Sequence, residues 1–436
     1  MNYDVHSLEI SNPKLKPSKK GSQSDSALFS YYAGFSESFT ISLLDQLSNK
    51  KEQLTIFDPW NGSGTTTFSA YKLGHDAIGS DLNPVMLIVA KARLINRLDL
   101  GSLEAICQTI FYNSLNGKLE LNLETDPLNV WFKEESTNFI RKVENAINHN
   151  FIDFNKYSDL TNKSTINKLS TIGAFIYVIL FKTVKTLLKS FVPSNPTWIK
   201  KPKSSEDRIY VNEKQIINVF FEILHNTIKV HSFNDYLHTN STINLYLNNS
   251  NSLTQENKSI DIILTSPPYC TRIDYAIATS VELAIIRNTN IRLLRENLTG
   301  NSTIKKKNIE PNLLWGETCN NFLQNVKSHS SVASSTYYYK NHLQYFDDIY
   351  KSIEQISRVL KPEGLFIPVV QNSFYKEINN DLAKIINEMS ENFGLSLIRE
   401  EIFPAKINMS SINSKSSKYL SKKSIIESVL IFKKCG

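Results

Sequence analysis

Glycine and proline are scarce in this chain, with 14 of each among 436 residues. That scarcity excludes collagen-like and proline-rich sequences, and it makes any cluster of either residue informative. The 4 cysteines lie far apart without a CxxC pair, so the sequence indicates neither a disulfide framework nor a zinc ribbon. We therefore expect a protein of a reducing cytoplasm.

The sequence also lacks long apolar runs and metal-binding spacings. The longest apolar run, Ile172–Phe181, is about half the length that a membrane span needs, and it predicts a buried helix. The N-terminus, MNYDVHSLEI, lacks the basic-then-apolar pattern of a signal peptide. The histidines show no HxxxH or His/Cys spacing. We expect neither a membrane nor a metal as a partner.

The residues that are present suit a folded protein larger than one compact domain. Hydrophobic residues make up 41% of the chain and aromatic residues 11%, which excludes a disordered protein. The length favours two units, or one domain with a large insertion. The net charge of +7 is compatible with a polyanionic partner.

An α/β pattern organises the chain. The segment LTIFDPWNGSGTTTFSAYKLGHDAIGSDLNP predicts a strand, a glycine turn, a helix and a second strand, the start of a nucleotide-binding α/β fold. Strands return at INLYLNNS, IDIIL, LFIPVVQNS, LSLIREEIF and ESVLIFKK, with helices predicted over Tyr345–Val359 and Ile378–Asn392. We divide the chain into a flexible N-terminal arm (1–26), the first half of a sheet (27–100), a mainly helical insertion (101–240) and the second half of the sheet (241–436).

Four of the 14 glycines fall between Asp58 and Asp81. A strand that ends at Asp58 and is followed by PWNGSGTTT lets the backbone approach a ligand, while the N–H groups of the next helix point at it. Asp81 ends the next strand, where an acidic side chain meets ribose hydroxyls in such folds. An ordinary tight turn is the alternative, since GxG is not the full GxGxxG pattern.

A second motif, Thr265-Ser266-Pro267-Pro268-Tyr269, directly follows the apolar strand IDIIL. Two prolines cannot continue a central strand, so the chain must stop at the carboxyl edge of the sheet, where ligands bind in open α/β folds. Rigid carbonyl acceptors beside an aromatic ring suit a flat molecule with an exocyclic amine. A plain strand-ending turn is the alternative.

Together these motifs carry a resemblance. DPWNGSGTT resembles the DPFxGSGTT loop of the S-adenosylmethionine-dependent DNA amino-methyltransferases, and TSPPY resembles their catalytic tetrapeptide in the cytosine-N4 spelling. FSYYAGFSESF is similar to their cofactor-closing motif, and RVLKPEG to their late helix–strand element. The resemblance implies a class I methyltransferase (Rossmann-like) fold, that is, a mostly parallel sheet with an antiparallel C-terminal strand, here with a helical insertion.

The resemblance also implies the site, with S-adenosylmethionine as the cofactor. It implies cofactor contacts from Tyr31, Phe35, Asp58, Trp60, Asn61, Gly62, Gly64, Thr65, Thr66, Asp81, Asn83, Asn249 and Ser250. It implies that the catalytic group consists of Ser266, Pro267, Pro268 and Tyr269. Two positions depart from the family pattern, because Trp60 replaces a phenylalanine and Asn249 replaces an aspartate near the adenine.

The expected chemistry is methyl transfer to the N4 amine of cytosine in double-stranded DNA. Hydrogen bonds from the amine to the Ser266 hydroxyl and the Pro267 carbonyl would favour a pyramidal nitrogen. Stacking on Tyr269 would hold the base in line with the methyl group. The base must leave the duplex to reach them. Cys270 follows the tyrosine and is interpreted as structural.

Two basic segments are candidates for DNA contact, with a solvated surface as the alternative for each. The residues are Trp198, Lys200, Lys201, Lys203 and Arg208 in the insertion, and Lys418 and Lys422 in a Ser/Lys loop. A restriction endonuclease is a further partner that the resemblance suggests, within a cytoplasmic restriction-modification or phage-defence system. Adenine-N6 methylation, RNA methylation and a non-catalytic DNA-binding subunit are the alternative functions.

Overall fold

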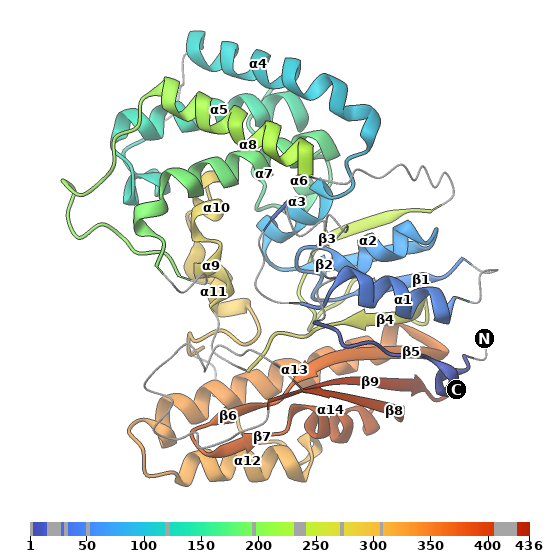
Figure 1. The fold of residues 1–436 in the computed structure, drawn as a ribbon. Helices are drawn as coiled ribbons and strands as arrows, with labels where there is room; N and C mark the ends of the chain where they lie inside the picture. The colour runs from blue at the N-terminus through green and yellow to red at the C-terminus, as the bar shows by residue number, and fades with distance from the viewer. Residues whose placement is uncertain are drawn as a thin grey trace.

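A seven-stranded sheet in the order β3-β2-β1-β4-β5-β9-β8 runs through the molecule (Figure 1). The computed structural model describes residues 3–14, 28–29, 34–48, 53–117, 123–193, 198–230, 241–270, 274–305, 308–404 and 425–436. The strands are β1 (Thr55–Asp58), β2 (Asp76–Asp81), β3 (Ile243–Leu247), β4 (Ile260–Thr265), β5 (Leu360–Gln371), β8 (Leu395–Pro404) and β9 (Ile426–Lys434). Strand β9 runs opposite to the other six strands of this sheet, so its pairings with β5 and β8 are antiparallel and the other pairings are parallel. The predicted class I methyltransferase fold is confirmed.

Helices of both halves of the sheet cover its two faces. They are α1 (Glu37–Leu47), α2 (Thr65–Lys72), α3 (Pro84–Ala92), α12 (Glu317–Ser328), α13 (Tyr339–Val359) and α14 (Leu382–Glu391). Helix α1 begins where the Ser36 hydroxyl accepts a hydrogen bond from Phe39 N. Its predicted apolar residues Phe39, Leu43, Leu44 and Leu47 are all buried, on one side of the sheet. Helices α12 to α14 pack with the other side.

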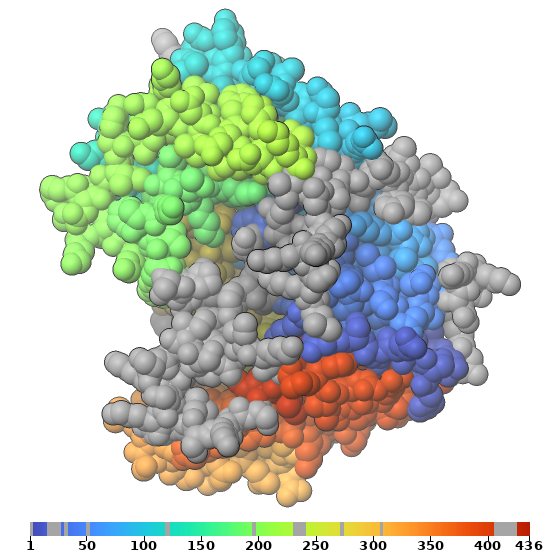
Figure 2. All heavy atoms as spheres, in the orientation of Figure 1, coloured from blue at the N-terminus to red at the C-terminus, as the bar shows by residue number. Residues whose placement is uncertain are grey.

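The helical insertion forms an upper lobe, drawn in cyan and green in Figures 1 and 2. It contains α4 (Leu100–Asn116), α5 (Glu134–Phe151), the short α6 (Lys163–Ile166), α7 (Thr171–Leu187) and α8 (Glu213–Val230). The apolar run Ile172–Phe181 lies in α7, which packs on α3 and shares one hydrophobic core with it. Within the described residues, no helix is long and apolar enough to cross a membrane.

A buried arginine ties the insertion to the second half of the sheet. Arg141 on α5 is fully buried and donates to the carbonyl oxygens of Ala284 (3.0 Å) and Ile285 (2.5 Å), the last two residues of α10 (Ser280–Ile285). Its charge is balanced by Asp126 at 2.9 Å and Glu144 at 3.3 Å. This contact fixes the insertion against the segment that follows the TSPPY motif.

We expect Arg141→Met to lower the free energy of unfolding by about 3–5 kcal/mol, because it leaves the half-buried Asp126 without its cation and the fully buried Glu144 with only Arg287, at 3.5 Å. Denaturant unfolding would measure the loss. Lys142→Met, one residue along the same helix and outside this cluster, serves as the control. A change of less than about 1 kcal/mol in the Arg141 variant would contradict the assignment.

The helix predicted over Tyr345–Val359 is confirmed but begins earlier, at Tyr339. Two further expectations from the sequence differ from the structure. The helix predicted over Ile378–Asn392 begins only at Leu382, because β7 (Ile378–Asn380) pairs with β6 (Ser373–Tyr375) in a hairpin and the Asp381 side chain caps α14. The second difference concerns the span predicted as a flexible arm. Its described part, residues 3–14, packs on the sheet through the buried Val5, and Arg399 on β8 binds three of its carbonyl oxygens.

Candidate active site

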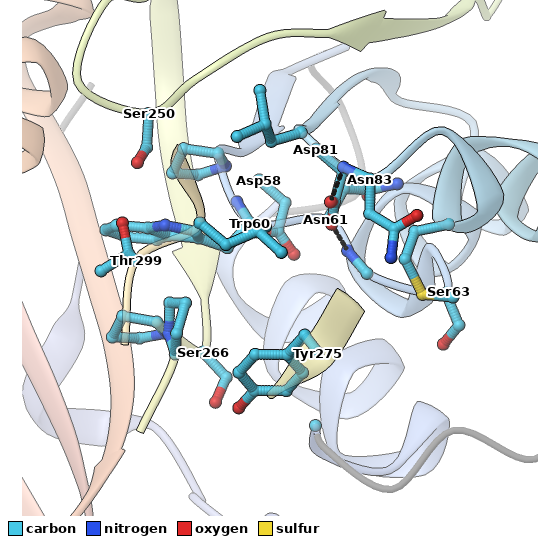
Figure 3. Close-up of a pocket in the computed structure, with 18 of the residues that line it drawn as sticks. Asp58, Trp60, Asn61, Ser63, Asp81, Asn83, Ser250, Ser266, Tyr275 and Thr299 are labelled. Atoms are coloured by element: carbon cyan, nitrogen blue, oxygen red, sulfur yellow. Dashed lines mark hydrogen bonds between the residues drawn. The ribbon is translucent and has the colours of Figure 1, made fainter. Parts of the chain in front are cut away.

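The two motifs meet at the carboxyl edge of the sheet because β1 and β4 are neighbours. A cavity opens there between the strand ends (Figure 3). The predicted residues that line it are Phe35, Asp58, Trp60, Asn61, Gly62, Thr65, Asp81, Asn83, Asn249, Ser250, Ser266, Pro267, Pro268 and Tyr269. The glycine loop and the tetrapeptide therefore form one site.

The glycine loop turns through two left-handed residues, Gly62 (φ 48°) and Gly64 (φ 83°). Gly62 lines the cavity, and its N–H donates to Asp81 Oδ2 at 2.9 Å. Gly64 lies behind the lining, where a Cβ would come within 2.8 Å of the Ala90 Cβ on α3. Gly64 thus permits close packing of α2 on α3, whereas Gly62 exposes backbone to the cavity.

Asp81 ends β2 with both carboxylate oxygens already engaged by backbone. Gly62 N donates to Oδ2, and Asn83 N donates to Oδ1 at 2.8 Å. Burial raises the pKa of Asp81 to about 6, against the lowering effect of these hydrogen bonds. Each oxygen keeps a lone pair, so the carboxylate can still accept a hydrogen bond from a ligand hydroxyl.

Asp58 joins the two motifs directly. Its carboxylate accepts hydrogen bonds from Thr265 Oγ1 (2.5 Å), from Thr66 Oγ1 (2.9 Å) and from Trp60 N (3.0 Å). Burial raises its pKa to about 6. Thr66 does not line the cavity, and its hydroxyl also donates to the Leu264 carbonyl. Asp58 therefore holds the glycine loop against the strand that carries the tetrapeptide.

Two more distant residues brace the tetrapeptide. The buried Tyr345 on α13 donates its hydroxyl to the Pro268 carbonyl at 3.0 Å. Gly300 (φ 76°) packs so closely that a Cβ there would lie 3.2 Å from the Tyr269 carbonyl oxygen. Tyr269 itself is only 8% exposed, and its hydroxyl donates to Glu427 Oε1 at 3.3 Å. The tetrapeptide is held in place before any ligand binds.

Sequence reasoning missed part of the cavity wall. Those residues are Gly34, Pro59, Ser63, Leu82, Met86, Asn248, Tyr275, Asn297, Leu298 and Thr299. Tyr275 belongs to the short α9 (Tyr275–Ala278), and Figure 3 shows it on the side of the cavity where Ser266 lies. Asn297 ends α11 (Ile291–Asn297), and Thr299 follows it. Among these residues, Leu82 is the one that a sequence signal could have found, because it lies between the predicted Asp81 and Asn83.

The candidate DNA contacts of the insertion lie in an exposed, anchored loop, residues 198–212, which we call the basic loop. Trp198 is 54% exposed, Lys200, Lys201 and Lys203 are exposed, and Arg208 is half-buried. Hydrogen bonds from Trp131 Nε1 to the Lys200 carbonyl and from Ile209 N to the Trp131 carbonyl hold its two ends together. None of these five residues lines the cavity.

Three predicted residues, Tyr31, Lys418 and Lys422, lie outside the described part of the chain. Where residues are described, no group of three or more His, Cys, Asp or Glu side chains could hold a metal ion.

Comparison with known proteins gives two relatives, whereas no family model matches. The type II methyltransferase M.MvaI of Kocuria varians is 26% identical over 368 residues, 79% of this chain and 76% of that protein. The type II methyltransferase M.BsoBI of Geobacillus stearothermophilus is 24% identical over 295 residues, 61% of this chain and 54% of that protein. The match with M.BsoBI thus spans about half of that relative's length.

Solved structures resemble the chain only distantly. The YcgJ protein of Bacillus subtilis gives a TM-score of 0.32 at 10% identity, over 91% of this chain and 98% of its own. A SAM-dependent methyltransferase of Methanosarcina mazei gives 0.29 at 9% identity, over 89% of this chain and 96% of its own. These scores are too low to support the fold assignment, which rests on the strand order of the sheet instead. The fold, the cavity and the type II relatives together support a methyltransferase with S-adenosylmethionine as its cofactor.

Proposed function

We propose that the chain transfers a methyl group from S-adenosylmethionine to the N4 amine of cytosine in double-stranded DNA. The observation that carries the proposal is the placement of Ser266, Pro267 and Tyr269 in one cavity with Gly62 and Asp81. An amine acceptor site and a nucleotide-type cofactor site then face the same space. The TSPPY spelling favours cytosine-N4 over adenine-N6.

The residues of the cavity fit the cofactor. Gly62 presents backbone at the N-terminal end of α2, where a methionine carboxylate would be favoured, and Asp81 offers acceptors for the ribose hydroxyls. Trp60 Nε1 is a buried donor with no hydrogen-bond partner among the described residues, as expected of a group that a polar ligand satisfies. When bound, S-adenosylmethionine supplies an electrophilic methyl group on a sulfonium.

On the amine side, the chain orients a weak nucleophile. The Ser266 hydroxyl and the Pro267 carbonyl accept hydrogen bonds from the amine, and the Tyr269 ring holds the base by stacking. The Tyr345 hydroxyl already donates to the Pro268 carbonyl, so the amine is directed to the Ser266 hydroxyl and the Pro267 carbonyl instead. The buried Asp58–Thr265 contact keeps this group at a fixed place relative to the cofactor loop. Positioning therefore supplies most of the rate.

The substrate assignment is tested by tritiated methyl transfer to unmodified DNA, followed by mass spectrometry of the nucleosides. N4-methylcytosine is the expected product. N6-methyladenine would replace the cytosine assignment, and label in RNA alone would contradict a DNA substrate. An absence of transfer together with normal cofactor binding would identify a non-catalytic subunit. The names of the two relatives, both type II methyltransferases, support a role in restriction-modification with a cognate endonuclease.

The basic loop is proposed to contact DNA phosphates. Replacing Lys200, Lys201 and Lys203 with alanine should weaken DNA binding and lower the slope of log K against log salt by up to about three units, since each contact releases about one counterion. Fluorescence anisotropy at several salt concentrations measures the slope. Lys258→Ala, before β4 at the amino edge of the sheet, is the control. An unchanged slope in the triple variant would identify a solvated surface.

A further inference from the structure

A hydrogen bond leads from a residue of the cavity wall into the protein. Ser266 and Tyr269 both line the cavity, and the Tyr269 hydroxyl donates to Glu427 Oε1 at 3.3 Å. Burial raises the pKa of Tyr269 and so does Glu427, whereas Ser266 lowers it. The Tyr269 hydroxyl proton therefore points away from the cavity, toward Glu427.

Glu427 is an unusual residue to find at this depth. It lies near the start of β9, is 2% exposed, and does not line the cavity. Lys14 Nζ lies 3.1 Å from Glu427 Oε1 and 5.3 Å from the centre of the Tyr269 ring. A buried carboxylate is costly unless it is paired, and the N-terminal segment supplies the cation.

The surroundings of Glu427 contain few other titratable groups. Its cross-strand neighbours are Gln371 on β5 and Phe403 on β8, neither of which titrates. Among the described residues, Lys14 and Tyr269 are the titratable groups in contact with it. Burial raises the pKa of Glu427, while Lys14 and the Tyr269 hydroxyl lower it.

The proposed reaction requires a proton acceptor. An amine that attacks a methyl group becomes an ammonium, and it must lose one proton to give the neutral methylated base. The Ser266 hydroxyl can accept a hydrogen bond from the amine, but a serine hydroxyl is not a base at neutral pH. The Glu427 carboxylate, which accepts the Tyr269 hydrogen bond, is a base of suitable strength.

We propose that Glu427 accepts the proton of the target amine through the hydroxyls of Tyr269 and Ser266, and that Lys14 keeps Glu427 ionised. The inference rests on the proposed methyl transfer. A nitrogen–carbon bond forms and the sulfur–carbon bond breaks, which leaves a neutral thioether. The amine proton moves to Ser266 Oγ, the serine proton to Tyr269 Oη, and the tyrosine proton to Glu427 Oε1.

Glu427→Gln tests the acceptor, because it preserves shape and removes the base. The rate of methyl transfer at saturating DNA and cofactor should fall by about 100-fold, with KM for DNA and the dissociation constant for S-adenosylmethionine within about two-fold of the parent's. Glu400→Gln, on an exposed position of the neighbouring strand β8, is the control. A parental rate in the Glu427 variant would overturn the proposal.

Tyr269→Phe interrupts the relay but keeps the ring that stacks. It should lower the rate about as much as Glu427→Gln, and the double variant should be no slower than either single one, because both remove the same path. Effects that multiply in the double variant, or a loss confined to KM, would contradict a relay and indicate a structural role.

Lys14→Met tests the pH dependence of the rate, which a purely structural role of Lys14 would leave unchanged. The rate should fall at low pH, where Glu427 is protonated, and removing the cation should raise the Glu427 pKa and shift this acid limb to higher pH. An acid limb that stays in place would overturn the role of Lys14. If the parent protein methylates DNA while these variants behave like it, the relay fails and the proposed function stands.

Discussion

Replacing Ser266 with alanine is expected to lower the rate of methyl transfer by about 100-fold and to leave the affinity for S-adenosylmethionine unchanged within about two-fold. In the proposed function the hydroxyl is the part of the side chain that meets the amine, and the residues proposed to bind the cofactor follow other strands. Rates measured with tritiated cofactor, and dissociation constants from calorimetry, separate the two effects.

Tyr269→Ala provides the comparison, since it removes a stacking surface rather than one hydrogen bond. It should weaken binding of the target base by about 1–3 kcal/mol as well as slow turnover. Ser252→Ala, an exposed serine after β3, is a matched control. If Ser266→Ala reduced cofactor affinity as strongly as turnover, Ser266 would belong to the cofactor site, and the division of roles would be wrong.

The parts of the site that sequence predicts well are those fixed by local structure. Asp58 and Asp81 end β1 and β2, Gly62 lies in the loop after β1, and the tetrapeptide follows β4. These strands are parallel neighbours, so the residues meet at the carboxyl edge of the sheet. The sheet order is predictable for the same reason. The βαβ start and the late strands leave little choice of topology.

The residues that sequence does not predict come from segments that only tertiary packing brings to the site. Glu427 begins the strand ESVLIFKK like any polar residue before an apolar run, and nothing local relates it to Tyr269, 158 positions away in the chain. Lys14 lies in a polar segment that is typical of a loose arm, yet the buried Val5 and the Arg399 contacts anchor that segment. Thr299 follows a short helix without any motif.

The helix boundary at Leu382 shows the same limit at the level of secondary structure. The sequence INND, residues 378–381, could extend the following helix if Ile378 and Asn380 were not paired with another strand. A turn at Lys376, whose φ is 55°, lets them pair with β6, and Asp381 then begins the helix. Local propensity was overridden by a hairpin contact.

Asp81→Asn is expected to weaken binding of S-adenosylmethionine by about 10–100-fold at pH 8, since a charged acceptor for the ribose hydroxyls is worth about 1.5–3 kcal/mol. The pKa of Asp81 near 6 adds a pH dependence. Below that value the carboxyl is protonated in the free protein and the charged acceptor is lost. The affinity of the parent should therefore fall as the pH drops from 7 to 5.

Two comparisons isolate the role of Asp81. Asp58 has a pKa near the same value but is committed to Thr265, Thr66 and Trp60 N, so Asp58→Asn should retain most of the pH dependence, whereas Asp81→Asn should lose most of it. S-adenosylhomocysteine shares the ribose and lacks the sulfonium charge. An equal loss of affinity for both ligands in Asp81→Asn would indicate a ribose contact. A loss confined to S-adenosylmethionine would instead show that Asp81 acts on the sulfonium, and a pH-independent affinity of the parent would show that its ionisation does not contribute to binding.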